Sequence, residues 1–260
     1  MNTRHGTDLA LAEEVPVALV FNGISHAVMM ASPSDLEDFA LGFALSEGLL
    51  SSASQLYGVD IEVLAQGIEV RLEVAAQAEQ HLKERRRSMA GRTGCGLCGA
   101  DSLSQVRLPL PQAPSVPLEV QAMFKAHGML RSLQPEKQRT GATHAAAWAS
   151  LDGDIQLVRE DVGRHNALDK LIGAMVKAQT DPTQGFVCIT SRASFEMVQK
   201  TIQSGAGVLT AVSAPTALAV DMAQDHKLLL AGLVRDGSYV AYSQAHLINT
   251  TPTLETHHGH

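Results

Sequence analysis

Two cysteines separated by two residues carry the strongest chemical signal in the chain. Cys95 and Cys98 lie in a Gly-Cys-Gly-Leu-Cys-Gly segment over residues 94–99. The thiolate is the reactive form of cysteine, and because a free thiol has a pKa of about 8.5, it needs positive surroundings to react near neutral pH. Residues 83–92 supply five Lys or Arg and one Glu. The flanking glycines leave room for a second protein to approach, so the pattern predicts an exposed thiol suited to exchange.

The same pair of cysteines fits three other interpretations. A zinc site would need two more ligands, and Cys188 lies in an apolar strand pattern that would bury it. A thioredoxin-type redox pair would begin a helix directly after a strand, whereas this pair lies among glycines. A purely structural pair needs no chemistry. None of the 11 histidines shows paired metal-ligand spacing near the cysteines, so we expect no structural metal.

A second polar group, residues 159–170, falls where a strand should end and a helix begin. In open α/β sheets ligands bind at this carboxyl edge, and a helix N-terminus favours anions. The candidates for cofactor binding here and in two loops at equivalent positions are Arg164, His165, Asn166, Ser191, Arg192 and Ser213. Taken alone, residues 159–170 fit an ordinary charged loop equally well. The three loops together predict a nucleotide or phosphorylated-cofactor pocket, although neither GxGxxG nor a P-loop lysine is present.

Composition limits the class of protein. The 260 residues are 45% hydrophobic and 18% charged, and a chain of this length buries roughly three quarters of its unfolded surface without disulfides or metals. A net charge of −7 and 4% aromatic residues argue against a nucleic-acid partner. No apolar run approaches the ~20 residues that span a bilayer, and the N-terminus lacks a signal-peptide core. We therefore expect a cytoplasmic globular protein with no membrane partner.

The first part of the chain should form hairpins and a helix. Asn22 and Gly23 favour φ > 0, as a two-residue hairpin turn requires. Ser32 is expected to cap the helix and Gly48 to close it. Tyr57 is assigned to the core. The elements expected are strands at 15–20, 24–30, 59–64 and 68–74, a helix up to residue 48, a short helix at 76–87 and a glycine-rich loop at 88–100.

Four prolines in residues 108–117 predict a stiff connector. We place the domain boundary there, with an N-terminal part over residues 1–113 and a C-terminal domain over residues 114–260. In the second part strands alternate with helices, which predicts a mostly parallel, layered α/β sheet with Trp148 and Cys188 in its core. The elements expected are strands at 145–150, 155–159, 186–190, 208–212, 228–234 and 239–242, and helices at 165–177, 195–204 and 216–224.

Four ordered segments resemble the FdhD family of formate dehydrogenase accessory sulfurtransferases. They are residues 94–99, 140–146, 160–170 and 191–200. The resemblance runs from about Glu14 to Tyr242. It implies an α/β fold (α+β overall) with a cytidine-deaminase-like C-terminal domain beside a smaller N-terminal part of hairpins and a helix.

The resemblance implies a sulfur carrier. A cysteine desulfurase would load a persulfide onto Cys95, with Cys98 as the partner thiol. The carrier would then pass the sulfur to a molybdenum (or tungsten) bis-guanine-dinucleotide cofactor for formate dehydrogenase. The family's cofactor-contacting turn maps to Leu233, Val234, Arg235, Asp236, Gly237 and Ser238, where Asp236 and Ser238 replace a neutral and a basic residue.

The expected active form is a homodimer. One alternative to the sulfur-carrier function is a chaperone that carries the cofactor without sulfur chemistry. Another is a zinc-dependent deaminase, whose HxE motif the chain lacks.

Overall fold

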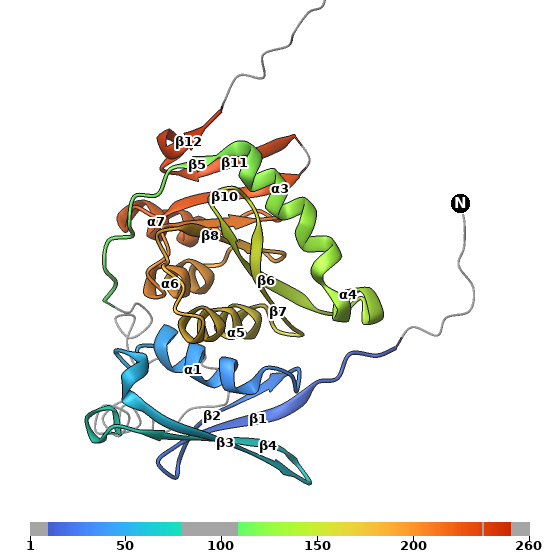
Figure 1. Ribbon diagram of the computed structural model, residues 1–260, viewed down its shortest axis with the longest axis vertical. Coiled ribbons are helices and arrows are strands. Elements are labelled where there is room, and N and C mark those ends of the chain that lie inside the picture. The colour runs from blue at the N-terminus through green and yellow to red at the C-terminus, as the bar shows by residue number, and fades with distance from the viewer. Residues whose placement is uncertain (1–9, 80–108, 236, 251–260) are drawn as a thin grey trace, which may run out of the picture.

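The computed structural model describes residues 10–79, 109–235 and 237–250. A four-stranded sheet and a six-stranded sheet lie on opposite sides of a layer of helices (Figure 1). This arrangement confirms the predicted layered α/β class. Within the described ranges no helix combines the length and apolar character that crossing a bilayer requires.

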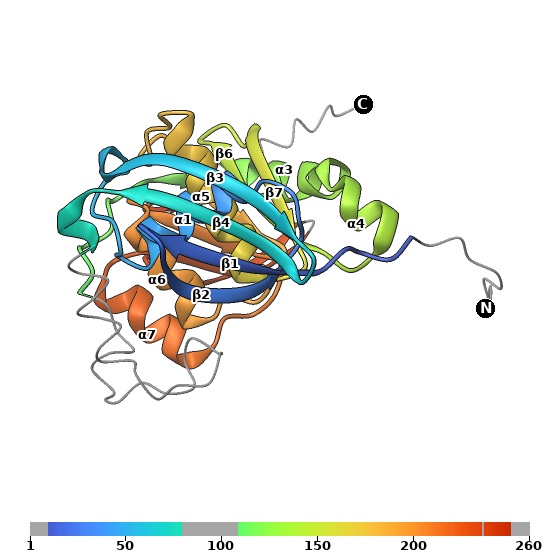
Figure 2. The same cartoon turned by 90° about the horizontal axis from the view of Figure 1, so that it is seen from below.

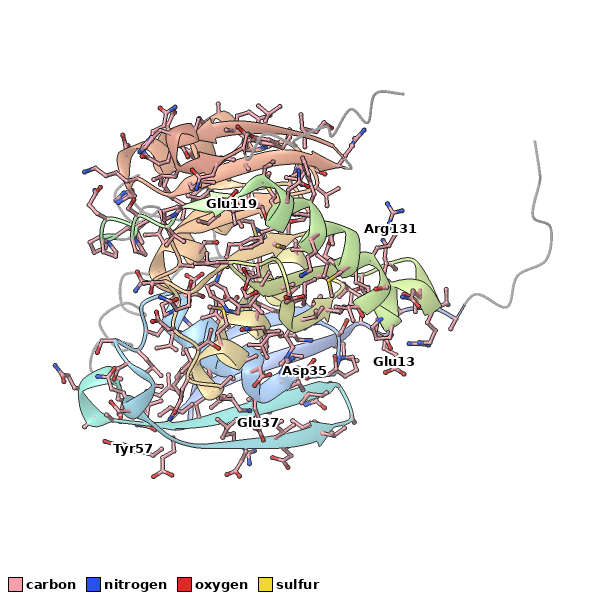
Figure 3. All side chains as sticks on the ribbon, turned by 45° about the horizontal axis from the view of Figure 1, so that its top comes forward. Glu13, Asp35, Glu37, Tyr57, Glu119 and Arg131 are labelled. Carbon is pink, nitrogen blue, oxygen red and sulfur yellow. The ribbon has the colours of Figure 1, made fainter. Side chains whose placement is uncertain are left out.

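The four-stranded sheet is built from two hairpins in the order β2-β1-β4-β3. Its strands are β1 (Val15–Phe21), β2 (Ile24–Ala31), β3 (Leu56–Leu64) and β4 (Gly67–Val74). Asn22 and Gly23 have φ angles of 46° and 78°, which confirms the predicted hairpin turn. The assignment of Tyr57 to the core is wrong. This residue is 66% exposed, because β3 is an edge strand whose register shifts at this point (Figure 3).

Helix α1 (Leu36–Ser46) lies behind this sheet in the view of Figure 2, and it packs against α5 (Arg164–Lys177). The prediction that Ser32 caps α1 is wrong. The helix begins after Asp35, whose φ is 52°, and Ser32 instead bonds to Asp161 and Val162 in the second part of the chain. Gly48 closes the helix as predicted, with a φ of 66°.

The backbones of α1 and α5 touch at two glycines. A Cβ atom on Gly42 would lie 1.7 Å from the Asp169 carbonyl oxygen, and one on Gly173 would lie 2.0 Å from the Asp38 carbonyl oxygen. Real Cβ contacts are never this short, so both positions require glycine. The two helices are therefore packed as closely as their backbones allow.

The six-stranded sheet has the order β11-β10-β9-β8-β6-β7. Its strands are β6 (His144–Ser150), β7 (Ile155–Asp161), β8 (Gly185–Ile189), β9 (Val208–Ala211), β10 (Leu229–Arg235) and β11 (Ser238–Ser243). Two of the five pairings are parallel, β8 with β9 and β9 with β10. The expectation of a mostly parallel sheet is therefore wrong, because tight turns make β6-β7 and β10-β11 antiparallel and β8 also pairs antiparallel with β6.

Helices cover both faces of this sheet. On one face α5, α6 (Phe195–Gln203) and α7 (Ala217–Asp225) pack on Trp148, Val187 and other alternate strand residues. On the other face α3 (Val120–Leu130) packs on a second set that includes Phe186 and Cys188, and α4 (Pro135–Thr140) follows it. Neither α3 nor α4 was expected from the sequence. Trp148 and Cys188 are buried as predicted.

Short elements complete the description. They are the 3-10 helices η1 (Ala53–Gln55), η3 (Arg131–Leu133) and η4 (Ala245–Leu247), and the paired strands β5 (Leu118–Glu119) and β12 (Ile248–Asn249). Of the predicted short helix, residues 76–79 are helical and the rest lies outside the described residues, as does the predicted loop at 88–100.

Candidate functional site

Four strands of the large sheet end at one edge. Strands β7 and β8 are both antiparallel to β6, and β8, β9 and β10 are mutually parallel, so β7 to β10 share one direction. The segments that follow them, residues 162–163, 190–194 and 212–216 and the turn after residue 235, therefore meet at the same edge (Figure 1). Helices α5, α6 and α7 begin directly after the first three. The edge thus collects the predicted site residues that the structure describes.

The first of these helix N-termini presents Arg164 and His165, the first two residues of α5. Arg164 Nε is buried and has no hydrogen-bond partner in the described part of the chain. His165 Nε2 lies 2.8 Å from Glu196 Oε2 on α6, close enough for an ion pair although it is not aligned as a hydrogen bond. Asn166 is buried, and its amide donates to the Met30 carbonyl and to Asp161. Both Asn166 donors are thus used inside the protein.

At the second N-terminus, that of α6, lies a buried serine hydroxyl that was not among the site residues expected from the sequence. Ser194 is the N-cap residue of α6, and it is only 8% exposed. Its Oγ makes no capping bond and has no hydrogen-bond partner among the described residues. Ser191 is buried and donates to the Arg192 carbonyl, while the Arg192 side chain is exposed. A serine directly before an amphipathic helix is the N-cap signal by which Ser194 could have been found.

The third N-terminus is capped internally. Thr216 Oγ1 accepts a hydrogen bond from the Ala219 amide, and the Thr216 amide donates to the Ala193 carbonyl, which ties this loop to the preceding one. Ser213 is half-buried, and its carbonyl accepts a hydrogen bond from the Leu233 amide.

The predicted cofactor-contacting turn begins at Leu233 with backbone strain. Leu233 has a φ of 54° within β10, at an irregularity of the β10-β11 register. A non-glycine residue in this region is uncommon and marks functional sites more often than ordinary strands. Val234 is buried, whereas Arg235, Gly237 and Ser238 are exposed. Asp236 lies outside the described residues.

The charges at this edge are mainly positive. Burial and the nearby charges of Lys137, Arg164 and His165 lower the pKa of His144, the first residue of β6. Burial opposes ionisation of Glu196, but the contact with His165 and the charges of Lys200 and Arg164 outweigh it and lower its pKa. Arg164 at the start of α5 and Arg192 just before α6 place permanent positive charge beside two helix N-termini, an arrangement that favours anions.

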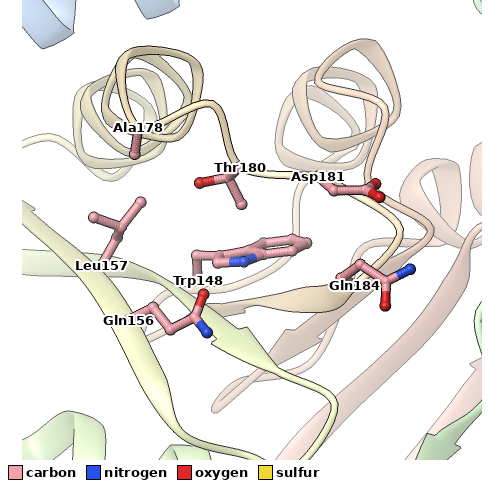
Figure 4. Close-up of a pocket in the computed structure, with 7 residues that line it drawn as sticks. All are labelled: Trp148, Gln156, Leu157, Ala178, Thr180, Asp181 and Gln184. Atoms are coloured by element: carbon pink, nitrogen blue, oxygen red, sulfur yellow. The ribbon is translucent and has the colours of Figure 1, made fainter.

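A cavity around Trp148, drawn in Figure 4, lies near the C-terminal end of α5 rather than at this edge. Its volume is about 400 Å³, and it is lined by Trp148, Gln156, Leu157, Ala178, Thr180, Asp181 and Gln184. Ala178 and Thr180 follow the C-terminal end of α5, roughly 20 Å along the helix from Arg164. The negative end of a helix and the Asp181 carboxylate disfavour phosphate, so this cavity is not part of the anion site.

The three cysteines differ in what the structure shows of them. Cys95 and Cys98 lie outside the described residues. Burial raises the pKa of the Cys188 thiol to about 12, which leaves it inert as a nucleophile at neutral pH. Cys188 is therefore a packing residue of the sheet.

Comparisons with known proteins agree on one family. The model of the FdhD/NarQ family matches residues 12–249. A protein of Cupriavidus necator named "Sulfur carrier protein FdhD" is 58% identical over 90% of this chain and 81% of its own. One of the same name from Variovorax paradoxus is 54% identical over 93% and 87% of the two chains.

A crystal structure agrees on the fold. It is described as a formate dehydrogenase accessory protein from Desulfotalea psychrophila, with 22% identity, a TM-score of 0.71, and coverage of 92% of this chain and 90% of that one. The family model covers most of the sequence, and both relatives named above are more than half identical to it. The chain belongs to the FdhD/NarQ family.

Proposed function

We propose that this protein is a sulfur carrier that activates formate dehydrogenase. Cys95 accepts a sulfane sulfur from a cysteine desulfurase, with Cys98 as the partner thiol, and passes it to a molybdenum (or tungsten) bis-guanine-dinucleotide cofactor, which is the substrate of the transfer. Support comes from the relatives named as sulfur carriers and from the glycine-flanked cysteine pair beside a cationic segment.

The loading step needs no outside oxidant or reductant. The Cys95 thiolate attacks the terminal sulfur of the desulfurase persulfide, and a new sulfur–sulfur bond forms on Cys95 while the old one breaks. The desulfurase cysteine leaves as a thiolate. Its leaving ability and the thiolate fraction of Cys95 both rise in positive surroundings, which the five cations of residues 83–92 supply.

The observation that carries the cofactor side of the proposal is the pair of orphan donors at the sheet edge. Arg164 Nε and Ser194 Oγ are buried without partners in the described structure, at the starts of two neighbouring helices. Leaving a buried donor unpaired costs about 1–3 kcal/mol, so such groups are normally satisfied. A phosphate bound between the two helix N-termini would accept from both donors and from free backbone N–H groups.

Holding the cofactor by its nucleotide arms would make sulfur transfer effectively intramolecular. A reacting group held in place can gain several orders of magnitude in effective concentration. In this proposal, the cations at the edge fix the phosphates, while the chemistry takes place on the metal and on Cys95.

Replacement of cysteines tests the sulfur chemistry. Cys95→Ala should abolish formate dehydrogenase activation in cells, whereas Cys188→Ala, the matched control at a buried cysteine, should leave activation intact. After incubation with a desulfurase and cysteine, the wild-type peptide containing Cys95 should gain about 32 Da, the mass of one sulfur atom. Full activation by Cys95→Ala would refute the sulfur-carrier proposal.

A cofactor chaperone without sulfur chemistry is the second candidate, because the anion site does not depend on the cysteines. The mass measurement separates the two, since only a sulfur carrier gains sulfur on Cys95. Calorimetry with GDP tests the binding site they share. We expect binding to the wild-type protein that weakens in Arg164→Ala and in Arg192→Ala, and an absence of binding to the wild type would remove the pocket from both candidates.

A further inference from the structure

The carboxylate of Asp161 is completely buried, accepts three hydrogen bonds and forms an ion pair. Oδ1 accepts from the Gly163 amide at 2.7 Å and from Asn166 Nδ2 at 3.0 Å. Oδ2 accepts from the Ser32 amide at 3.0 Å and forms an ion pair with Lys170 Nζ at 2.7 Å. A carboxylate offers about four lone-pair sites, so three hydrogen bonds and one ion pair leave no room for a further ligand. Neither Asp161 nor Lys170 exposes any of its side chain.

These bonds determine where α5 begins. Gly163 is the N-cap residue of α5 and has no side chain with which to cap it. The bond from its amide to Asp161 closes the turn between β7 and α5 and sets the direction in which the helix leaves the sheet. Arg164 and His165 are the next two residues, so their positions at the anion site depend on this turn.

Lys170 keeps the turn electrically neutral. An unpaired carboxylate buried one turn from Arg164 would weaken the attraction of this edge for a phosphate, since charges interact strongly where water is excluded. The Lys170 ammonium cancels that charge at 2.7 Å. It also donates to the Ser32 carbonyl at 3.0 Å.

The same group ties the turn to the N-terminal sheet. The Val162 amide donates to Ser32 Oγ at 3.2 Å, and Asn166 donates to the Met30 carbonyl at 2.9 Å. The segment at the end of β2 therefore forms one wall of the turn, although it lies 129 residues away from Asp161 in sequence.

We propose that Asp161 and Lys170 are positioning residues for nucleotide binding, which hold the α5 N-terminus in place and neutralise one another beside the phosphate. This inference rests on the proposed function. It adds that a buried ion pair, braced by the backbone of residues 30–32, determines the affinity of the site without touching the ligand.

Two isosteric variants test the proposal. Asp161→Asn replaces one carboxylate oxygen with an NH2 group. Its two N–H donors would then face N–H donors from which that oxygen accepted. Asp169→Asn is the matched control, because Asp169 is also a buried carboxylate paired with a lysine, Lys200, but it lies inside α5 and contacts Ser46 rather than the turn before the helix. The two readouts are the dissociation constant for GDP by calorimetry and the urea midpoint of unfolding.

We expect both variants to lower the urea midpoint. Asp161→Asn should weaken GDP binding at least tenfold, whereas Asp169→Asn should change it less than threefold. Wild-type-like GDP affinity in Asp161→Asn, or equal weakening in both variants, would overturn the inference and leave the proposed function standing. Failure of the wild type to bind GDP would instead remove the proposed cofactor site, and this inference with it.

A milder variant covers the case in which Asp161→Asn does not fold. Ser32→Ala removes only the hydroxyl that accepts from the Val162 amide. It should weaken GDP binding at least threefold and speed up hydrogen exchange at the Val162 amide. Unchanged GDP affinity in a folded Ser32→Ala protein with faster exchange at this amide would contradict the positioning role.

Discussion

Mild acid should destabilise the protein through one imidazole, that of His127 on α3. Its Nε2 lies 2.8 Å from Thr210 Oγ1. The Thr210 hydroxyl donates its own proton to the Val187 carbonyl at 3.1 Å, so Nε2 must carry the imidazole proton. Nδ1 is then a buried acceptor with no partner among the described residues. Because a second proton would be buried as well, burial lowers the pKa of His127 from 6.5 to about 4.

The size of the effect follows from linkage. Between pH 6.5 and pH 4 the unfolded chain binds a proton at His127 that the folded chain does not. The contribution to stability is therefore fully present above pH 6.5 and is lost as the pH falls toward 4. At about 1.36 kcal/mol per pKa unit, the loss is ~2 kcal/mol between about pH 7.5 and about pH 5, and ~3 kcal/mol below pH 4.

Urea unfolding of the wild type and of His127→Gln at both pH values measures this loss. The glutamine amide can still donate to Thr210 but does not titrate. The free energy of unfolding should therefore fall by ~2 kcal/mol more in the wild type than in the variant. Other titrating groups, His144 included, are common to both proteins and cancel in the difference. Equal losses in the two proteins would refute the assignment of the acid sensitivity to His127.

Three other perturbations have expected outcomes. Gly42→Ala should lower the free energy of unfolding in urea by ~3 kcal/mol, because the new Cβ atom would collide with the backbone of α5. The control Gly128→Ala, whose Cβ atom would meet no atom within 4 Å, should raise that free energy by ~0.5–1 kcal/mol. A loss of stability in both variants would contradict the packing argument. Lys200→Met should lower the free energy of unfolding by ~3–5 kcal/mol, because it leaves the Asp169 carboxylate buried without its ion-pair partner. Adding Asp169→Asn should recover most of that loss, and no recovery in the double variant would count against the ion pair. Iodoacetamide at neutral pH should leave Cys188 unmodified in the native protein and should modify it after unfolding, as measured by peptide mass mapping. Rapid modification of Cys188 in the native protein would show that this thiol is not buried in the sheet.

Elements with strong local signals were predictable, and those held by packing were not. The Asn22-Gly23 turn and the strands on either side of it follow from backbone preferences that act over a few residues. Helix α3 was missed because two of its five buried residues are alanines, and because His127 and Gly128 lower its intrinsic helix propensity. Its stability comes from the sheet against which it packs.

The candidate site shows the same division. That Arg164 and His165 lie at a shared sheet edge follows from the order of strands and helices. The bonds from Ser32 to Asp161 and from Ser46 to Asp169 do not, because they join residues 129 and 123 positions apart, and no local pattern encodes such a partner. Side chains that position the site are therefore harder to predict than those that line it.

The contact of α1 with α5 at Gly42 and Gly173 has a consequence for dissecting the protein. At its glycine, each helix has a strip of backbone without a side chain, and the backbone of the other helix covers it. The neighbouring residues Asp169 and Lys170 form hydrogen bonds with Ser46 and Ser32 of the first part, respectively. A fragment that ended at the proline-rich connector would expose this strip together with half-satisfied buried charges. The two pieces would form a native-like protein only by reassembling with each other.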